Sequence, residues 1–330
     1  MFNKQITQQR NKITQEIRNF FNEQNFTEVE TPILVDIPGM EPHLTPFETT
    51  FASPNTKDQK LYLNTSPELQ MKKLLGAGFG DIYQITKVFR NGETGGPLHN
   101  PEFTMLEWYR INANYLDLMD DCEKLILSLT AGGQVCNKPK IPQAPWPRKT
   151  TNELFIEHCG IDLTQNKTYE EFKQTAKKAD LDTIACNTWD DIFFKIFLNH
   201  IEPNLPTGPI FIYNYPSTQA ALAKKSDKNP FFAERFELYI NKIELSNAFS
   251  ELIDPQEQRQ RLKQEQEERK QLNKTIFPID EEFLKALESI QQPCAGIALG
   301  LDRLIMILLN LNSVEETLIL KTPLCHQQLT

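Results

Sequence analysis

The sequence has 330 residues, which is enough for one large catalytic domain or one domain with an insertion. Hydrophobic residues make up 39% and charged residues 24%, as in an ordinary globular protein, and no apolar run is long enough to span a membrane. The formal net charge of -9 disfavours extensive binding to nucleic acid, because phosphate backbones bind basic surfaces. The polar start of the chain has no apolar signal-peptide segment, so we expect a cytoplasmic protein.

Several common chemical motifs are missing from the sequence. The two usual glycine-rich phosphate loops are absent, and so are the GxSxG and HExxH signatures of hydrolases and metalloproteases. The six cysteines form no CxxC pair and do not cluster with the five histidines, so we expect reduced thiols rather than zinc ligands or disulfides. These cysteines are Cys122, Cys136, Cys159, Cys186, Cys294 and Cys325.

The first part of the chain alternates helical and extended patterns. Residues 8–25 place apolar side chains at helical spacing, and residues 26–32 predict a short strand that ends at a proline. A second short strand at 61–63 leads into a helix, for which Ser66 is the expected N-cap and Pro67 the first helical residue.

The middle of the chain predicts a hairpin, a linker and a helical insertion. Residues 81–90 and 103–109 read as antiparallel strands joined by a loop rich in Gly and Pro. Four prolines in 138–147 indicate a linker. Residues 150–205 are expected to form a mostly helical insertion within a single domain that covers residues 1–330.

The last part of the chain returns to strands. Residues 235–240 and 243–249 read as a hairpin around a two-residue turn at 241–242. The charged segment 255–273 is expected to be a solvated surface helix, and a Gly-rich strand at 295–301 precedes an apolar helix. Because most of these strands pair locally, we expect an α+β fold with an antiparallel sheet flanked by helices.

The first group of residues that could carry chemistry lies in the hairpin of the middle segment. Arg90 ends one strand, and Phe103, Glu107 and Tyr109 return on the next. An arginine there could hold a phosphate or carboxylate in bidentate fashion, and an aromatic ring could stack on a base. The alternative is a surface hairpin whose aromatic residues lie in the core.

The second group is acidic. With a two-residue turn at 241–242, Tyr239 faces Glu244, and Glu237 lies on the same face of the sheet. Two carboxylates on one face suit Mg²⁺, which binds through one or two carboxylates and phosphate oxygens. Glu251 has the opposite parity on a straight strand, and joins them only if a bulge or a strand end intervenes. An exposed acidic face is an equally good interpretation.

The third group is the segment 296–303. Glycines in a strand often mark the close approach of a ligand or of another backbone. Arg303 opens an apolar helix, where a cation is unfavourable with the helix dipole, so it indicates a role in binding an anion. The alternative is an ordinary surface arginine.

Together these segments resemble the three signature motifs of class II aminoacyl-tRNA synthetases, in the same order. Residues 26–32 resemble motif 1, which forms the dimer interface in that family, 89–109 resemble motif 2, and 296–303 resemble motif 3. The resemblance spans about residues 8–311. The lysine-specific branch is indicated by Thr65-Ser66-Pro67-Glu68, by the run from His99 to Glu107, and by Glu244-Leu245-Ser246-Asn247 with Glu251.

The pattern resembles most the elongation factor P–(R)-β-lysine ligases, a family of lysyl-tRNA synthetase paralogues. They lack the N-terminal anticodon-binding domain, for which this sequence has no room before motif 1. The resemblance implies a homodimer that activates (R)-β-lysine with ATP and Mg²⁺, attaches it to a lysine of elongation factor P and does not bind tRNA. Ala298 stands where lysyl-tRNA synthetases usually have Gly, and its methyl group would reshape the amino-acid pocket.

Carried over by position, the resemblance implies roles for individual residues. Arg90 and Arg303 would be catalytic and would bind the phosphates of ATP. Further ATP-binding residues would be Asn91, Glu93, His99, Asn100, Phe103, Glu237, Glu244, Leu245 and Gly300, with Glu237 and Glu244 also holding Mg²⁺. The amino-acid-binding residues would be Ser66, Pro67, Glu68, Glu107, Tyr109, Asn247, Ala298 and Glu251, the last pairing with the distal ammonium.

The sequence departs from the family in two places, and other activities stay open. The motif 2 loop is one residue longer than expected. Gly92 stands in it where lysyl enzymes have Glu, so Glu93 is expected to substitute. Ala248 replaces a Gly that is usual in the family. The alternatives are a truncated lysyl-tRNA synthetase that activates L-lysine, an ATP-dependent asparagine synthetase, and a catalytically silent regulatory paralogue. A pocket with Glu107 and Glu251 would repel an acidic substrate, and the nucleotide-binding residues argue against a silent paralogue.

Overall fold

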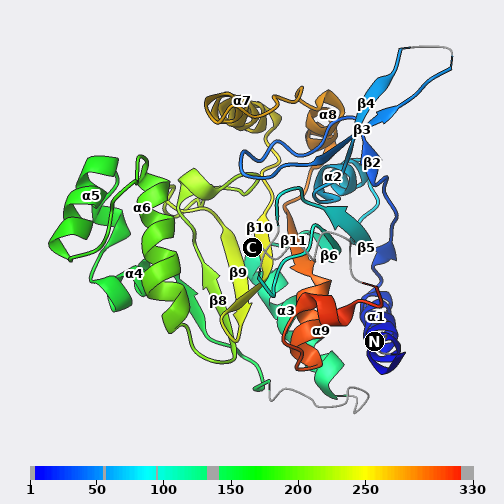
Figure 1. Ribbon diagram of the computed structural model, residues 1–330, viewed down its shortest axis with the longest axis horizontal. Coiled ribbons are helices and arrows are strands. Elements are labelled where there is room, and N and C mark those ends of the chain that lie inside the picture. Colours follow the sequence, from blue (N-terminus) through cyan, green and yellow to red (C-terminus); the bar gives the residue numbers. More distant parts are fainter. Residues whose placement is uncertain (1–3, 55–56, 94–95, 132–140, 321–330) are drawn as a thin grey trace, which may run out of the picture.

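The computed structural model describes residues 4–54, 57–93, 96–131 and 141–320 (Figure 1). Its main sheet has the strand order β1-β5-β6-β11-β10-β9-β8-β7. The strands, in that order, are Thr27–Glu28, Ile82–Phe89, Glu102–Ile111, Cys294–Gly300, Ile243–Ser250, Arg235–Ile240, Pro209–Tyr213 and Arg148–Thr150. A small sheet holds β2 (Leu34–Val35), β4 (Gln59–Leu63) and β3 (Phe47–Phe51).

The central strands of the main sheet pair in antiparallel fashion, and the α+β prediction is confirmed. The outermost pairs, β1 with β5 and β7 with β8, are parallel, which the sequence did not indicate. In both pairs a helix lies between the two strands in sequence, as a parallel connection requires. The β9–β10 hairpin turns at Asn241 and Lys242, whose φ angles of 54° and 66° fit a tight two-residue turn.

The helices cover both faces of the sheet. They are α1 (Lys4–Glu23), α2 (Glu68–Gly76), α3 (Tyr115–Ala131), α4 (Thr151–Cys159), α5 (Tyr169–Lys178), α6 (Trp189–Ile196), α7 (Pro255–Gln271), α8 (Glu281–Ser289) and α9 (Leu301–Leu308). Short helical turns occur at Leu163–Gln165, Phe197–Ile201, Glu202–Asn204, Ser217–Gln219 and Val314–Thr317. No helix in the described ranges combines the length and the apolar character that a membrane crossing requires.

Neighbouring residues of β6 show which helices lie on which face. Trp108 belongs to the hydrophobic core that α1, α3 and α9 share with the sheet. Tyr109, the next residue, belongs to a second core with α2 and α8. Side chains alternate along a strand, so these two sets of helices cover opposite faces. Phe103 and Glu107 have the parity of Tyr109 and therefore lie on the face of α2 and α8.

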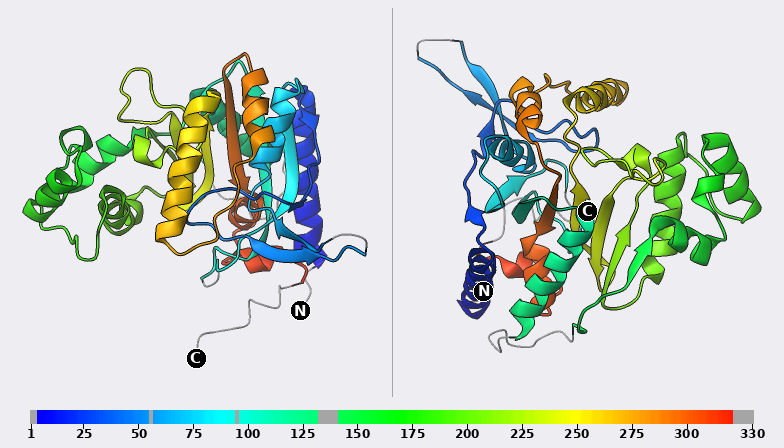
Figure 2. Two further views of the ribbon diagram at one scale, coloured as in Figure 1. Left: turned by 90° about the horizontal axis from the view of Figure 1, so that it is seen from above. Right: turned by 180° about the vertical axis from the view of Figure 1, so that it is seen from behind.

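Helices α4 to α6 lie beyond β8, at the end of the molecule away from α1 (Figures 1 and 2). Each begins with a capping box. The side chain of Thr150, Thr168 or Thr188 accepts a hydrogen bond from the backbone N–H three residues later, and the carboxylate of that later residue accepts one from the threonine N–H. Their aromatic residues, such as Phe172 and Phe193, form a core of their own with side chains of β8 and β9. That this segment is an insertion in a single domain stays a prediction.

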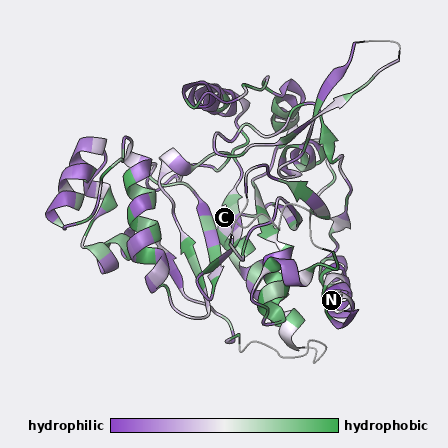
Figure 3. Ribbon diagram, viewed as in Figure 1, coloured by the Kyte–Doolittle hydropathy of each residue, from purple (hydrophilic) through white to green (hydrophobic). Residues whose placement is uncertain are grey.

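Two expectations about helices need correction. Helix α2 begins at Glu68, so Pro67 rather than Ser66 occupies the N-cap position, although Ser66 Oγ still accepts a hydrogen bond from the Glu68 N–H at 3.1 Å. Helix α7 is hydrophilic along its length (Figure 3), yet it is not simply a solvated surface helix. Leu262 and Arg269 are buried, and Arg269 donates hydrogen bonds to backbone carbonyls. Hydropathy could not reveal an arginine that is buried by bonding to main chain.

The cysteines in the described part of the chain are free thiols, as expected. Cys122, Cys186 and Cys294 are buried, and Cys159 is partly buried. Burial raises the pKa of the Cys294 thiol to about 12, which keeps it protonated and unreactive. The predictions for Cys136 and Cys325 lie outside the described residues.

Candidate active site

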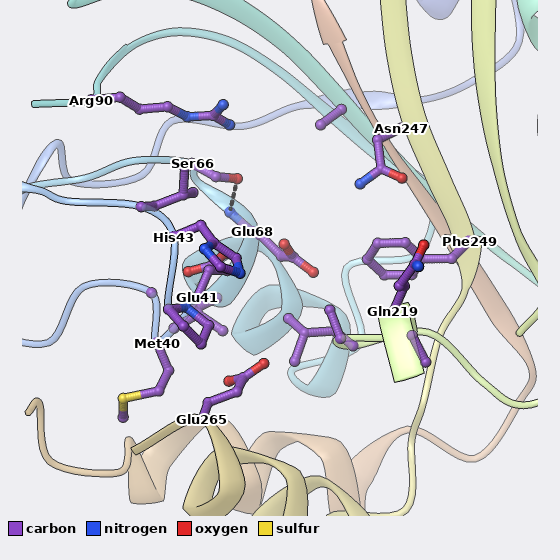
Figure 4. Close-up of a pocket in the computed structure, with 18 of the residues that line it drawn as sticks. Met40, Glu41, His43, Ser66, Glu68, Arg90, Gln219, Asn247, Phe249 and Glu265 are labelled. Atoms are coloured by element: carbon purple, nitrogen blue, oxygen red, sulfur yellow. Dashed lines mark hydrogen bonds between the residues drawn. The ribbon is translucent and has the colours of Figure 1, made fainter. Parts of the chain in front are cut away.

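A cavity of ≈ 660 Å³ opens on the face of the sheet that α2 and α8 cover. Strands β6, β10 and β11 supply its floor, and α2, α7 and the loop 37–44 supply its walls. Figure 4 shows Ser66, Glu68, Asn247 and Phe249 around one common space. The residues expected from the sequence that line it are Ser66, Glu68, Arg90, Glu93, His99, Asn100, Phe103, Glu244, Leu245, Asn247, Ala298, Gly300 and Arg303.

A bulge in β10 decides which of its side chains face the cavity. Glu244 pairs with Tyr239, but Asn247 pairs with Glu237, so β10 has one extra residue between these pairs. Tyr239 and Glu237 share a face, and the bulge therefore puts Glu244 and Asn247 on that same face. Glu251 continues the parity of Asn247. The sequence left open whether a bulge or a strand end brings Glu251 to the face of Glu244. The bulge in β10 does so.

One end of the cavity is basic. Arg90 follows the end of β5, and its guanidinium lies 5.2 Å from the centre of the Phe103 ring. Arg303, in the first turn of α9, donates from Nη1 to the Glu244 carbonyl at 2.7 Å, and its Nη2 lies 3.0 Å from His99 Nε2. Burial and the Arg303 charge lower the pKa of His99, so a neutral ring can accept from Arg303.

Buried carboxylates lie directly behind the other end of the cavity, which we call its acidic end. Glu107 is 1% exposed and accepts hydrogen bonds from Ser66 Oγ at 2.9 Å and from the Tyr109 hydroxyl at 2.6 Å. Burial and then the charge of Glu68 raise the pKa of Glu107 to about 8. Burial likewise raises the pKa of Glu251 to about 8, although a lysine beside it acts in the opposite direction. A cation that enters the cavity would therefore stabilise the charged forms of these two carboxylates.

Gly296 shows how tightly the acidic end is packed. A Cβ on this residue would lie 2.3 Å from the Tyr109 ring and 2.5 Å from Glu251 Oε1. The glycine thus allows β11 to run directly beneath these two side chains, as its place in a strand suggested. Glu107, Tyr109 and Glu251 stand behind the cavity surface and do not line it.

The two carboxylates expected to hold Mg²⁺ differ in their surroundings. Glu237 accepts hydrogen bonds from Tyr215 at 2.6 Å, Tyr239 at 2.9 Å and Arg235 at 2.7 Å, and it does not line the cavity. Glu244 lines the cavity, and its side chain is 45% exposed. Partial burial and the nearby Glu237 charge raise the pKa of Glu244. In the described ranges no group of three or more His, Cys, Asp or Glu side chains could hold a metal.

Two of the predicted site residues are held near the cavity by the main chain. The Asn91 N–H donates to the Thr45 carbonyl at 2.7 Å, and the Pro67 carbonyl accepts from the Met71 N–H at 2.9 Å. Neither side chain lines the cavity. Their place in the site stays a prediction.

Sequence reasoning missed several side chains of the site. Arg235 donates to Asn247 Oδ1 at 2.9 Å as well as to Glu237, and Lys72 lies between Glu68 and Glu251. Two spacings could have revealed them. Arg235 precedes Glu237 by two residues on a strand, and Lys72 follows Glu68 by four on a helix. No pattern marks loop 37–44 or Glu265 of α7, which also line the cavity (Figure 4).

A mainly antiparallel sheet, with a basic and an acidic end in one cavity above it, defines a class II synthetase-type catalytic domain. The family model of class II tRNA synthetases (D, K and N) matches residues 2–321, and the chain belongs to this family. The family resemblance that the motifs indicated is thereby confirmed.

The chain is also similar to curated relatives that are named elongation factor P–(R)-β-lysine ligase. It is 40% identical over 311 residues to the protein of Histophilus somni, which covers 94% of this chain and 92% of the relative. Identity is also 40% to the proteins of Buchnera aphidicola, with 96% and 95% covered, and of Vibrio cholerae, with 93% and 92% covered.

Proposed function

We propose that this protein activates (R)-β-lysine with ATP and transfers the β-lysyl group to a lysine side chain of elongation factor P. The observation that carries the proposal is a single cavity with arginines at one end and buried carboxylates directly behind its other end. Such a cavity suits a substrate whose carboxylate meets ATP while its ammonium groups meet acids. The names of the 40%-identical relatives support the same substrate and acceptor.

In the first step, an oxygen of the substrate carboxylate attacks the α-phosphorus of ATP. The bond from that phosphorus to the bridging oxygen breaks, and pyrophosphate leaves. The carboxylate is itself the nucleophile, so the enzyme needs neither a base nor a covalent intermediate. Catalysis then consists of positioning and charge neutralisation: Arg90 binds the carboxylate and the α-phosphate, and Arg303 binds the γ-phosphate.

In the second step, the neutral amine of the acceptor lysine attacks the carbonyl carbon of the adenylate. A C–N bond forms, the C–O bond to AMP breaks, and the amine proton leaves to solvent. Glu265 of α7 lines the cavity on the side away from Arg90 (Figure 4). We place the entry of the acceptor lysine there.

The adenine is proposed to stack on Phe103, whose ring lies beside Arg90. His99 and Asn100 would contact the base, and Asn100 is 3% exposed and fixed by a bond from Nδ2 to the Glu102 carbonyl at 2.6 Å. Glu93, Leu245 and Gly300 complete the lining at this end, with Asn91 outside it.

Magnesium would bind with ATP beside Glu244. The exposed carboxylate of Glu244 fits one ligand position, whereas both oxygens of Glu237 already accept hydrogen bonds. One open carboxylate is sufficient, because Mg²⁺ keeps water and phosphate oxygens as its other ligands. When bound, the ion would neutralise charge on the phosphates. We propose that Glu237 acts mainly by orienting Arg235 and Tyr239, which both donate hydrogen bonds to it.

At the acidic end, Ser66 and Glu68 would meet the amino group near the reacting carboxylate. Glu251, with Glu107 and Tyr109 around it, would pair with the distal ammonium. Asn247 and Ala298 shape the floor between these two points.

We also propose that the protein forms a homodimer through the segment 26–32 and acts in the cytoplasm as a single domain with a helical insertion. Exposed apolar side chains near that segment, Ile33 at 36% and Leu34 at 45%, support a covered face there. Light scattering on the purified protein tests the dimer, since a monomer mass at micromolar concentration would contradict it.

ATP–pyrophosphate exchange with (R)-β-lysine, L-lysine and L-aspartate tests the activity. Strong exchange with (R)-β-lysine, followed by labelling of elongation factor P, is the expected result. A preference for L-lysine would favour the truncated synthetase, and a preference for L-aspartate the asparagine synthetase. Absence of exchange in a folded protein that binds ATP would favour a silent paralogue.

A further inference from the structure

Lys72 lies behind the acidic end of the cavity, although none of the family motifs pointed to it. Its side chain is 2% exposed, and Nζ lies 2.6 Å from Glu68 Oε1 and 2.5 Å from Glu251 Oε2. The centre of the Phe249 ring is 5.1 Å from Nζ. A buried ammonium is costly unless it is paired, and the two carboxylates provide that pairing.

The backbone fixes the place of this ammonium. Lys72 and Glu68 are four residues apart on α2, whereas Glu251 follows the end of β10, so Lys72 ties a helix to the sheet. Helix α2 cannot easily shift, because a Cβ at Gly76 would lie only 2.4 Å from the Ala286 carbonyl oxygen of α8. The lysine is thus part of the wall and holds its partners in place.

Glu251 depends on this contact. It is 5% exposed, and within the described part of the chain its carboxylate oxygens have no polar partner besides the Lys72 ammonium, which lies 2.5 Å from Oε2. Burial raises its pKa, the charges of Glu68 and Glu107 raise it further, and Lys72 is the cation that lowers it. Without the ammonium, the group would be neutral or would turn away from its present position.

We propose that Lys72 is a positioning residue for the amino-acid substrate, because it orients the Glu251 carboxylate for the distal ammonium and favours the charged form of this carboxylate. The proposal rests on the proposed function. Charge counting supports it. When a bound substrate brings Glu68, Glu107 and Glu251 to their ionised forms, they carry three negative charges, and Lys72 compensates one. The remaining two match the two ammonium groups of a diamino acid, whereas a monoamino acid leaves one buried charge unpaired.

The test compares the wild type with Lys72→Met, Glu251→Gln and the double variant in ATP–pyrophosphate exchange. Lys72→Met is expected to raise the KM for (R)-β-lysine about tenfold or more and to change the KM for ATP less than about twofold. In the Glu251→Gln background there is no carboxylate left for Lys72 to orient at that position. The double variant should therefore have a KM for (R)-β-lysine within about threefold of that of Glu251→Gln.

Several results would overturn the inference. These are an unchanged KM for (R)-β-lysine in Lys72→Met, single effects that multiply in the double variant, or an equal rise of the KM for ATP. If Lys72→Met alone does not fold, the double variant, which removes both charges together, is compared with Glu251→Gln. A KM for (R)-β-lysine that differs between these two by more than about threefold counts against the proposal. A wild type that activates no diamino acid would remove the proposed function and the inference together, whereas the other results leave the function standing.

Discussion

Ala298 is the direct neighbour of Glu107 across the β11–β6 pair, and its other neighbour, across β10–β11, is Asn247. Residues in register on adjacent strands point to the same face. The methyl group of Ala298 therefore lies in the cavity floor between a buried carboxylate and an amide. Its size sets the depth of the floor at this point.

Ala298→Gly is expected to lower the preference for (R)-β-lysine over L-lysine by about tenfold, since one methyl group changes discrimination by that order. The measurement is the ratio of kcat/KM for the two amino acids in pyrophosphate exchange. Ala248→Gly is the matched control, because Ala248 is buried on the opposite face of the sheet. An equal change of the ratio in both variants would mean that loosening of the sheet, and not the cavity floor, is responsible.

Arg90→Ala should lower kcat for adenylate formation by about a hundredfold to a thousandfold, the usual effect of removing a group that stabilises developing charge. Arg259→Ala serves as control. Arg259 lies on α7, its side chain is 40% exposed, and its one ion pair in the described part of the chain is with Glu281. Single-turnover formation of the adenylate separates this step from product release. Wild-type rates in Arg90→Ala would exclude the assigned role.

Gly296→Ala should destabilise the fold by about 1–3 kcal/mol, because its Cβ would overlap the Tyr109 ring and the Glu251 carboxylate. Gly300→Ala, in the same strand β11, is the comparison, because a Cβ on Gly300 would come no closer than 3.7 Å to Arg303. Urea denaturation of both variants gives the two free energies of unfolding. A loss in Gly300→Ala as large as in Gly296→Ala would show that strand glycines are needed for another reason.

Stability should depend on pH through Glu107. Burial raises the pKa of its folded form from the ordinary 4.5 to about 8. The protonated carboxyl thus favours the folded state, and its contribution is complete below the unfolded pKa and is lost as the pH rises through the folded one. We expect the free energy of unfolding to fall between about pH 4.5 and 8, and Glu107→Gln to flatten this part of the profile.

Glu157→Gln is the control for that measurement. The pKa of Glu157 is lowered by Lys149, so its contribution is lost as the pH falls below the ordinary range. The substitution should leave the window between about pH 5 and 8 unchanged. A wild-type profile that is level across this window would contradict the buried, protonated state of Glu107.

The sequence was sufficient for the fold class, and most of the residues that it assigned to the site line the cavity, because strand parity and the order of the motifs place them on one face. Arg90, Phe103 and Arg303 converge as expected. Lys72 was missed because its partner Glu251 is distant in sequence, and only the packing of α2 against the sheet brings the two together. The α7 side of the cavity was missed for the same reason, since a uniformly polar helix gives no sign of the face that it buries.

The extra residue in β10 has a consequence for how this strand can vary. Asn247, Phe249 and Glu251 face the substrate side only because the extra residue Leu245 shifts the alternation by one position. Many single replacements at Leu245 would preserve that phase, whereas deletion of any one residue between Glu244 and Asn247 would reverse it. The number of residues in this strand is therefore more tightly constrained than the chemical nature of the residue at the bulge.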